Sequence, residues 1–361
     1  MTHAEVLEIK KQFTPKKSAL SRLATCYVDH EKNIVFKHRE TILAAEEEEL
    51  FKYLKTLSAI FTGKEGKTLH SKEFPLINGR DGGMQEQLLE LRDSDLSDEK
   101  LDEFYEQVIE HFNYPENYLI MIANGHYDAP KKASDGAILE DSEENYSFIT
   151  CAICPVKLEK PALSIGAKGL VSNDRRFMVQ APVTGLLFPA FNDRAEDIHG
   201  MLYYAKKELF SDLMTTLTGT EAQLNADSQK EAFVNLMENM GSEIIPFDTV
   251  QEVCQAIGQK ELDNNEPTPA LINKEEIKSI FNENGIPTDT FDDAYEQLGL
   301  PEEMPAYNLV DIAKTKIAAP DVEIKIKPEK ADLVEKTIID GKPCLVINLE
   351  GSVSVNDIVT Q

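Results

Sequence analysis

The fold of this chain is decided by one apolar stretch, FITCAICPV, which runs from Phe148 to Val156. A second stretch, YLIMIA, covers Tyr118–Ala123. Short runs that are apolar at nearly every position predict strands buried on both faces of a sheet. Between them, Lys131–Asn145 is polar, and we expect a mobile surface loop there. Further strands are predicted at Ala19–Val28 and Ile34–Lys37, and all of these elements would share one mixed sheet.

Helical patterns flank and follow these strands. Beyond Asp197 the apolar spacing becomes helical, and it predicts helices over Ile198–Leu217, Ser228–Met240 and Val250–Ile257. Near the C-terminus, Asp340-Gly341 separates two apolar runs, which is a strong signal for a hairpin with a type I′ turn. The sequence therefore predicts an α+β protein. Its expected parts are a mixed-sheet domain over 1–195, a helical segment packing on it over 196–265, and a C-terminal α+β domain with a β-hairpin over 266–361.

The composition limits the classes of partner. The chain has 361 residues with 64 acidic and 37 basic side chains, a formal net charge of −27. Such a surface repels phosphate backbones and anionic membranes at long range. No apolar run approaches the roughly eighteen residues that span a bilayer, and the N-terminus lacks a secretory pattern. Five cysteines fit reduced thiols, so we expect a cytoplasmic protein.

Cys151-Ala152-Ile153-Cys154 has the spacing of a metal or redox motif. A structural zinc ion needs four ligands, and the sequence offers no second pair of cysteine or histidine residues at ligand spacing. In a strand, positions i and i+3 point to opposite faces. We therefore interpret both residues as buried core cysteines, and the sequence predicts neither a metal nor a cofactor.

The densest polar cluster is the stretch NDRAEDIH, residues 192–199. Its carboxylates and imidazole are the groups that a divalent metal ion or an acid–base pair requires. A metal-dependent hydrolase that uses Asp193, Asp197 and His199 is therefore one hypothesis. The alternative, which we favour, is a helix N-terminus with acidic capping residues and a surface Asp–Arg pair. The candidate cluster comprises His126, Asn192, Asp193, Arg194, Asp197 and His199, although His126, at a strand end, favours a structural role.

Two further segments have weaker functional interpretations. A small basic region could contact phosphates or an acidic partner, or could simply be a solvated surface; it contains Lys10, Lys11, Lys16, Lys17 and Arg22. The loop Gly82–Gln85 superficially resembles the Gly-Gly-Gln loop of peptide release factors, but Met84 interrupts that tripeptide. A translation-associated factor is the function that this loop would imply, and an ordinary turn is the favoured interpretation.

Several phrases spread over nearly the whole chain resemble a known family. They are EIKKQFTP, CYVD, LLELRDSDL, CAICPV, LFPAFNDRAEDIH, LYY, PDVEIKIKPEKADLVE and IDGKPCLVI. On these phrases the chain is identified as a member of domain of unknown function family 4317, from low-GC Gram-positive bacteria. This resemblance implies no activity.

A second resemblance is more distant. The segment LMTTLTGTEAQLNADSQKEAF, Leu213–Phe233, is similar to the NdpA-type nucleoid-associated proteins of bacteria. The order of elements is also similar, with an apolar strand that ends in His126-Tyr127 and a short helical region over Phe291–Leu309. The resemblance implies an association with the nucleoid and no enzyme chemistry. Asp227 departs from that family's pattern, and no residue is identified as a DNA ligand.

Together these observations predict a non-enzymatic, acidic cytoplasmic protein that acts by binding macromolecules, with the nucleoid as one location. The net charge favours a protein partner over direct contact with DNA. No membrane partner is expected, and a homo-oligomer is compatible with the composition.

Overall fold

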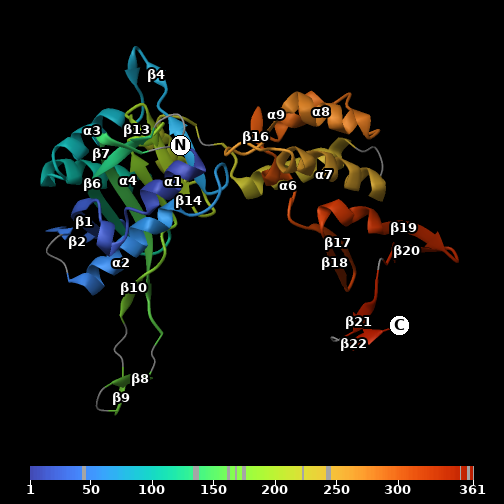
Figure 1. The fold of residues 1–361 in the computed structure, drawn as a ribbon, viewed down its shortest axis with the longest axis horizontal. Coiled ribbons are helices and arrows are strands. Elements are labelled where there is room, and N and C mark those ends of the chain that lie inside the picture. Colours follow the sequence, from blue (N-terminus) through green and yellow to red (C-terminus); the bar gives the residue numbers. More distant parts are fainter. Residues whose placement is uncertain are drawn as a thin grey trace. The chain divides into compact units, whose positions relative to one another are not determined.

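The structure is a computed structural model that describes residues 1–42, 46–132, 138–160, 163–166, 169–172, 176–221, 223–240, 245–349, 351–355 and 358–360. These residues form two compact units, Met1–Asn225 and Ala226–Gln361 (Figure 1). Helices and strands occur in both units, which confirms the predicted α+β class. The boundary between the two units lies after Asn225, within the stretch 196–265.

The first unit contains an eight-stranded sheet with the order β2-β1-β6-β7-β11-β14-β3, and β10 pairs with β7 beside this path. Every pairing in this sheet is antiparallel, so the prediction of a mixed sheet is wrong. The reason lies in the connections: β1–β2 and β6–β7 are hairpins, whereas parallel neighbours need a long crossover. The strands are β1 Leu20–Val28, β2 Ile34–Thr41, β3 Leu69–Glu73, β6 Tyr118–Lys132, β7 Ile138–Leu158, β10 Phe177–Val179, β11 Thr184–Phe188 and β14 Gly200–Ala205.

Helices cover both faces of this sheet, because its central strands are apolar at successive positions. Along β6, Ile120 and Ile122 belong to one buried cluster, whereas Met121 and Ala123 belong to another. The first cluster includes side chains from α3 Gln85–Asp93, α4 Asp98–His111 and α5 Ser211–Thr218. The second includes side chains from α1 His3–Lys10, α2 Glu47–Ser58 and the 3₁₀ helix η3 Ala59–Phe61. The sheet therefore separates two cores.

The cysteine pair of β7 confirms the interpretation made from the sequence. Cys151 belongs to the first core and Cys154 to the second, so the two thiols point to opposite faces. Both side chains are buried, and all five cysteines of the chain are free. Burial raises the pKa of the Cys154 thiol to about 12 and that of Cys151 further still. Neither thiol is poised for redox chemistry.

Two segments differ from the prediction. The helix predicted over Ile198–Leu217 is wrong in its first half, which forms the buried strand β14 before α5 begins at Ser211. An apolar run as short as this one is compatible with both a helix and a strand. Pairing with β11 and β3 makes it a strand. The loop predicted over Lys131–Asn145 is wrong at both ends, because ladder pairing extends β6 to Lys132 and starts β7 at Ile138. Residues 133–137 lie outside the described residues.

The smaller elements of the first unit are short hairpins and one turn of helix. They are η1 Pro15–Lys17, β4 Leu76–Ile77, β5 Arg80–Asp81, β8 Leu163–Gly166, β9 Gly169–Ser172, β12 Ala190–Asn192 and β13 Ala195–Asp197.

The second unit is built from helices and two-stranded hairpins. The predicted hairpin is confirmed: β19 Val334–Ile339 pairs with β20 Lys342–Ile347, and the turn has φ of 49° at Asp340 and 76° at Gly341. These positive angles are those of a type I′ turn. The other elements are α6 Ala226–Met240, α7 Phe247–Leu262, β15 Leu271–Asn273, α8 Lys274–Glu283, α9 Phe291–Gln297, β16 Glu303–Pro305, α10 Ala306–Leu309, β17 Thr315–Ala319, β18 Val322–Ile326, η4 Pro328–Leu333, β21 Val353–Val355 and β22 Ile358–Thr360.

Candidate functional site

The polar stretch 192–199 forms a hairpin. Strands β12 and β13 are joined by Asp193 and Arg194, whose φ angles are 50° and 62°. The predicted helix N-terminus is therefore wrong at this position. A two-residue turn with two positive φ angles has type I′ geometry, which an aspartate tolerates better than most residues.

Several polar side chains of this hairpin form hydrogen bonds or ion pairs with the protein. Asn192 donates to one carboxylate oxygen of Asp197 at 2.6 Å, and the backbone amide of His199 donates to the other at 3.0 Å. The exposed His199 ring lies 2.6 Å from a carboxylate oxygen of Asp81. Arg194 forms an ion pair with Glu8 and donates to a backbone carbonyl of β6 at 2.6 Å. These contacts tie the hairpin to α1 and to the sheet.

The hydrolase hypothesis needs Asp193, Asp197 and His199 to converge, but the His199 ring contacts Asp81, and the Asp197 carboxylate accepts from Asn192 and from the His199 backbone amide. Within the described part of the chain, no three His, Cys, Asp or Glu side chains are grouped closely enough to hold a metal ion. His126 lies on β6, where its Nδ1 atom is 2.9 Å from the hydroxyl of Ser147 on β7. The geometry of the candidate cluster gives the hydrolase hypothesis no support.

The five residues of the predicted basic region lie at different places on the first unit. Lys10 donates to the hydroxyl of Thr62 at 2.8 Å. Lys11, Lys16 and Lys17 are exposed on the end of α1 and on η1. Arg22 forms an ion pair at 2.7 Å with Asp95, which lies in the loop between α3 and α4. This loop is on the opposite face of the sheet from α1. The five residues therefore do not form one cationic surface.

The Gly82–Gln85 loop is packed inside the first unit. The amide of Met84 donates to the carbonyl of Leu217 at 3.1 Å, and Gly83 lies against Gly219 at the end of α5. Gln85 is buried, and its amide group donates to the Ile198 carbonyl at 3.2 Å. A buried and hydrogen-bonded glutamine cannot be presented to a substrate, so this loop gives the translation-factor hypothesis no support.

One polar pocket of about 540 Å³ brings Arg22 and His126 together with residues that the sequence did not single out. Asn124 donates to Asp95 at 2.6 Å and accepts from the Arg22 amide at 3.0 Å. Arg92 is paired with carboxylates of Asp93 and Glu196, at 2.7 and 2.5 Å. Because both arginines are neutralised by carboxylates, the pocket serves as a network that ties the α3–α4 loop to the sheet. Its members are far apart in the sequence, which explains why no local pattern revealed them.

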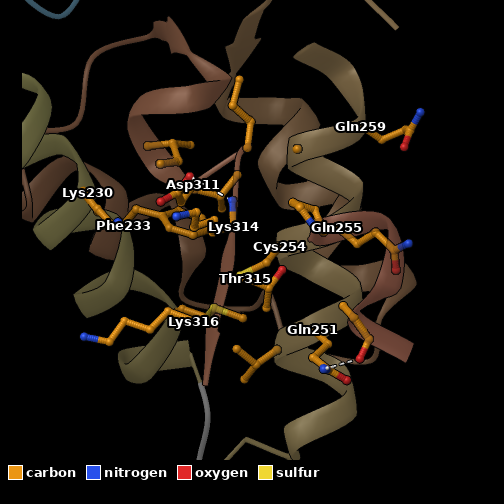
Figure 2. A pocket seen from close by; sticks show the side chains of 18 of the residues that line it. Lys230, Phe233, Gln251, Cys254, Gln255, Gln259, Asp311, Lys314, Thr315 and Lys316 are labelled. Carbon is orange, nitrogen blue, oxygen red and sulfur yellow. Dashed lines mark hydrogen bonds between the residues drawn. The ribbon is translucent and has the colours of Figure 1, made fainter. Parts of the chain in front are cut away.

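The second unit contains a groove with a volume of about 890 Å³ (Figure 2). One wall is a face of α6, whose lining side chains recur at helical spacing from Lys230 to Glu238. A second wall is a face of α7 from Val250 to Leu262, along which Gln251, Gln255 and Gln259 form a row four residues apart (Figure 2). The rest of the groove is lined by Leu309 at the end of α10, by Val310–Ile312 and Lys314–Lys316 after it, and by Pro328, Glu329 and Ala331 of η4.

The groove combines an apolar interior with polar edges. Phe233 and Met237 are buried, whereas Val234, Val250 and Leu262 remain 44%, 36% and 53% exposed. A Cβ atom at Gly258 would lie 3.8 Å from Val310, an ordinary van der Waals distance, so the groove has room for a small side chain at this position of α7. The half-buried Cys254 also lines the groove, and burial raises the pKa of its thiol. A concave, largely apolar surface with a few polar groups is typical of binding sites.

The lysines of the groove differ in their partners. Lys316 is paired with Glu323 at 2.7 Å. Lys230 and Lys314 have no carboxylate within 4 Å among the residues that the structure describes. The amphipathic spacing of α6 is readable in the sequence, but the opposing wall comes from residues about 80 positions further along and could not be predicted.

None of the described helices is both long and apolar enough to cross a membrane. A comparison with curated proteins found no match. A comparison with family models gave one that covers residues 1–358, and it confirms the family predicted from the sequence phrases. The chain therefore belongs to the family described as Domain of unknown function (DUF4317).

Proposed function

We propose that this protein is a non-enzymatic binding protein that attaches to protein partners through the groove of its second unit. The observation that carries the proposal is the groove itself, which leaves Val234, Val250 and Leu262 substantially exposed along one continuous depression of about 890 Å³. Apolar side chains left in a concavity gain free energy when a partner covers them, at roughly 25 cal/mol per Å² of apolar surface. Isolated exposed apolar residues need no such explanation, but a lined groove does.

The charge of the chain favours a protein as the partner. A net charge of −27 opposes association with nucleic acid at long range. The two arginines of the polar pocket already have carboxylate partners, so they offer little to a phosphate backbone. We place the protein in the cytoplasm, where it would reach the nucleoid through a bound protein, as its resemblance to nucleoid-associated proteins implies.

An affinity capture with a matched pair of variants tests this proposal. The full-length protein, its Val250→Glu variant and its Val322→Glu variant are immobilised and exposed to lysate of the source bacterium, with and without nuclease. Val250 lines the groove, whereas Val322 is an exposed valine of β18 outside it. We expect one protein to be retained by the wild type and by Val322→Glu after nuclease treatment, and at least tenfold less of it by Val250→Glu.

Two outcomes would contradict the proposal. Equal retention by both variants would show that the groove is not the binding surface. Loss of every partner after nuclease treatment, combined with binding of the purified chain to duplex DNA that weakens steeply with salt, would make DNA the direct partner.

A further inference from the structure

The dimensions of the groove suit a short helix. Its α7 wall extends from Val250 to Leu262, and twelve residues of α-helix span about 18 Å. An amphipathic helix of about three turns would cover this length with its apolar face. Partners of this kind bind grooves between two helices through side chains at positions i, i+3, i+4 and i+7.

The charges of the groove are arranged along this axis. Lys230 and Glu238 lie eight residues apart on α6, which separates them by about 12 Å. Figure 2 shows Lys230, Asp311 and Lys314 at about the level of Gln255, and Lys316 at the level of Gln251. Gln251 marks the opposite end, where its amide donates to the Ala331 carbonyl at 3.1 Å and so brings η4 with Glu329 beside the start of α7. At the Gln251 end Lys316 is neutralised by Glu323 at 2.7 Å, which leaves Glu238 and Glu329 as the excess charge there. Toward the other end the two lysines Lys230 and Lys314 outnumber Asp311.

Two contacts define which of these charges are free for a partner. The Asp311 carboxylate, at the cationic end, accepts the backbone amides of Ala313 and Lys314 at 2.9 and 3.2 Å, so its own loop occupies one of its oxygens. Glu329 lies 3.9 Å from Lys327, which is a loose pair. Lys230 and Lys314 are left without carboxylate partners among the described residues, in a chain that has a large excess of carboxylates.

We propose that the groove binds an amphipathic helix of a partner protein, about three turns long, with acidic side chains at the Lys230/Lys314 end and basic side chains at the Glu238/Glu329 end. This inference rests on the proposed function and specifies the partner's chemistry. The apolar floor provides most of the binding free energy, and the charges at the two ends fix the direction in which the helix lies. The acidic surface of the rest of the chain repels helices that carry only acidic residues.

A displayed library of random 14-residue peptides, selected on the immobilised full-length chain, tests this inference. Peptides that also bind Val250→Glu are removed by counter-selection. Enriched peptides are then measured against the wild type, against the double variant Lys230→Glu/Lys314→Glu, and against a control with Lys64→Glu/Lys67→Glu. The control lysines lie in the first unit and change the net charge by the same amount.

We expect enriched peptides with apolar residues at helical spacing and acidic residues at one end. Charge reversal of Lys230 and Lys314 should weaken the affinity of these peptides about tenfold, and the control variant should bind them with an affinity within twofold of the wild type. Groove-dependent peptides that lack helical spacing, or that tolerate the reversal, would overturn this inference and leave the proposed function intact. Selection that yields no groove-dependent peptide would also overturn this inference, whereas the affinity capture with Val250→Glu decides the proposed function independently.

Discussion

The close contact between Gly83 and Gly219 allows a sharp test of the packing that holds the Gly82–Gln85 loop. Gly219 ends α5 with φ of +72°, and a Cβ atom there would lie 2.5 Å from the backbone nitrogen of Gly83. Backbone atoms cannot rotate away as a side chain can. Gly219→Ala therefore combines a left-handed backbone with an overlap that only a shift of the loop could relieve.

Gly79→Ala is the matched control in the same unit. Gly79 has φ of +80°, and a Cβ atom there would meet nothing within 4 Å. The left-handed conformation destabilises the folded state by about 1–2 kcal/mol for either alanine. In both variants the alanine also makes the unfolded chain less flexible, which offsets about 0.4–1 kcal/mol of this loss. Overpacking adds about 1–3 kcal/mol for Gly219→Ala alone. We expect the free energy of unfolding to fall by about 1 kcal/mol for Gly79→Ala and by about 2–4 kcal/mol for Gly219→Ala.

Urea unfolding of the full chain, monitored by a probe in the first unit, measures both losses. Each kcal/mol should also lower the melting temperature of this unit by about 2–4 °C. Hydrogen exchange at the Met84 amide gives a local readout, because this amide donates to the Leu217 carbonyl in the native structure. Equal destabilisation by the two variants, with unchanged protection of the Met84 amide, would refute the close backbone contact.

Two further predictions concern titration and thiol chemistry. Burial lowers the pKa of His70 from 6.5 to about 4. Since the unfolded chain then binds more protons than the native one between these values, stability should fall by at most about 3 kcal/mol as the pH drops from 6.5 to 4. His70→Gln should flatten this part of the pH–stability curve, and a curve parallel to that of the wild type would contradict this assignment. Native labelling with iodoacetamide, followed by mass spectrometry, should modify the half-buried Cys344 and spare Cys151 and Cys154 until urea unfolds the first unit. Early labelling of the β7 pair would show that the two cores are not closed.

Local patterns in the sequence were sufficient wherever a few adjacent residues decide the structure. Asp340-Gly341 specifies a type I′ turn because few residue pairs accept two positive φ angles. The apolar stretch Phe148–Val156 specifies a strand with two buried faces, and the opposite directions of Cys151 and Cys154 follow from the two-residue period of a strand. The family could also be recognised from short phrases of the sequence.

Contacts between distant residues had to come from the tertiary structure. The run Gly200–Ala205 is apolar enough for either a helix or a strand, and only its neighbours β11 and β3 make it a strand. Arg22 is basic in the sequence, but Asp95 neutralises it, and Asn124 holds Asp95 in place, from positions that no local spacing connects to it. The groove arises in the same way, because α6 and α7 supply two amphipathic faces and a segment about 80 residues later supplies the third wall. Burial and charge pairing depend on which side chains meet in space, and chain order alone does not contain that information.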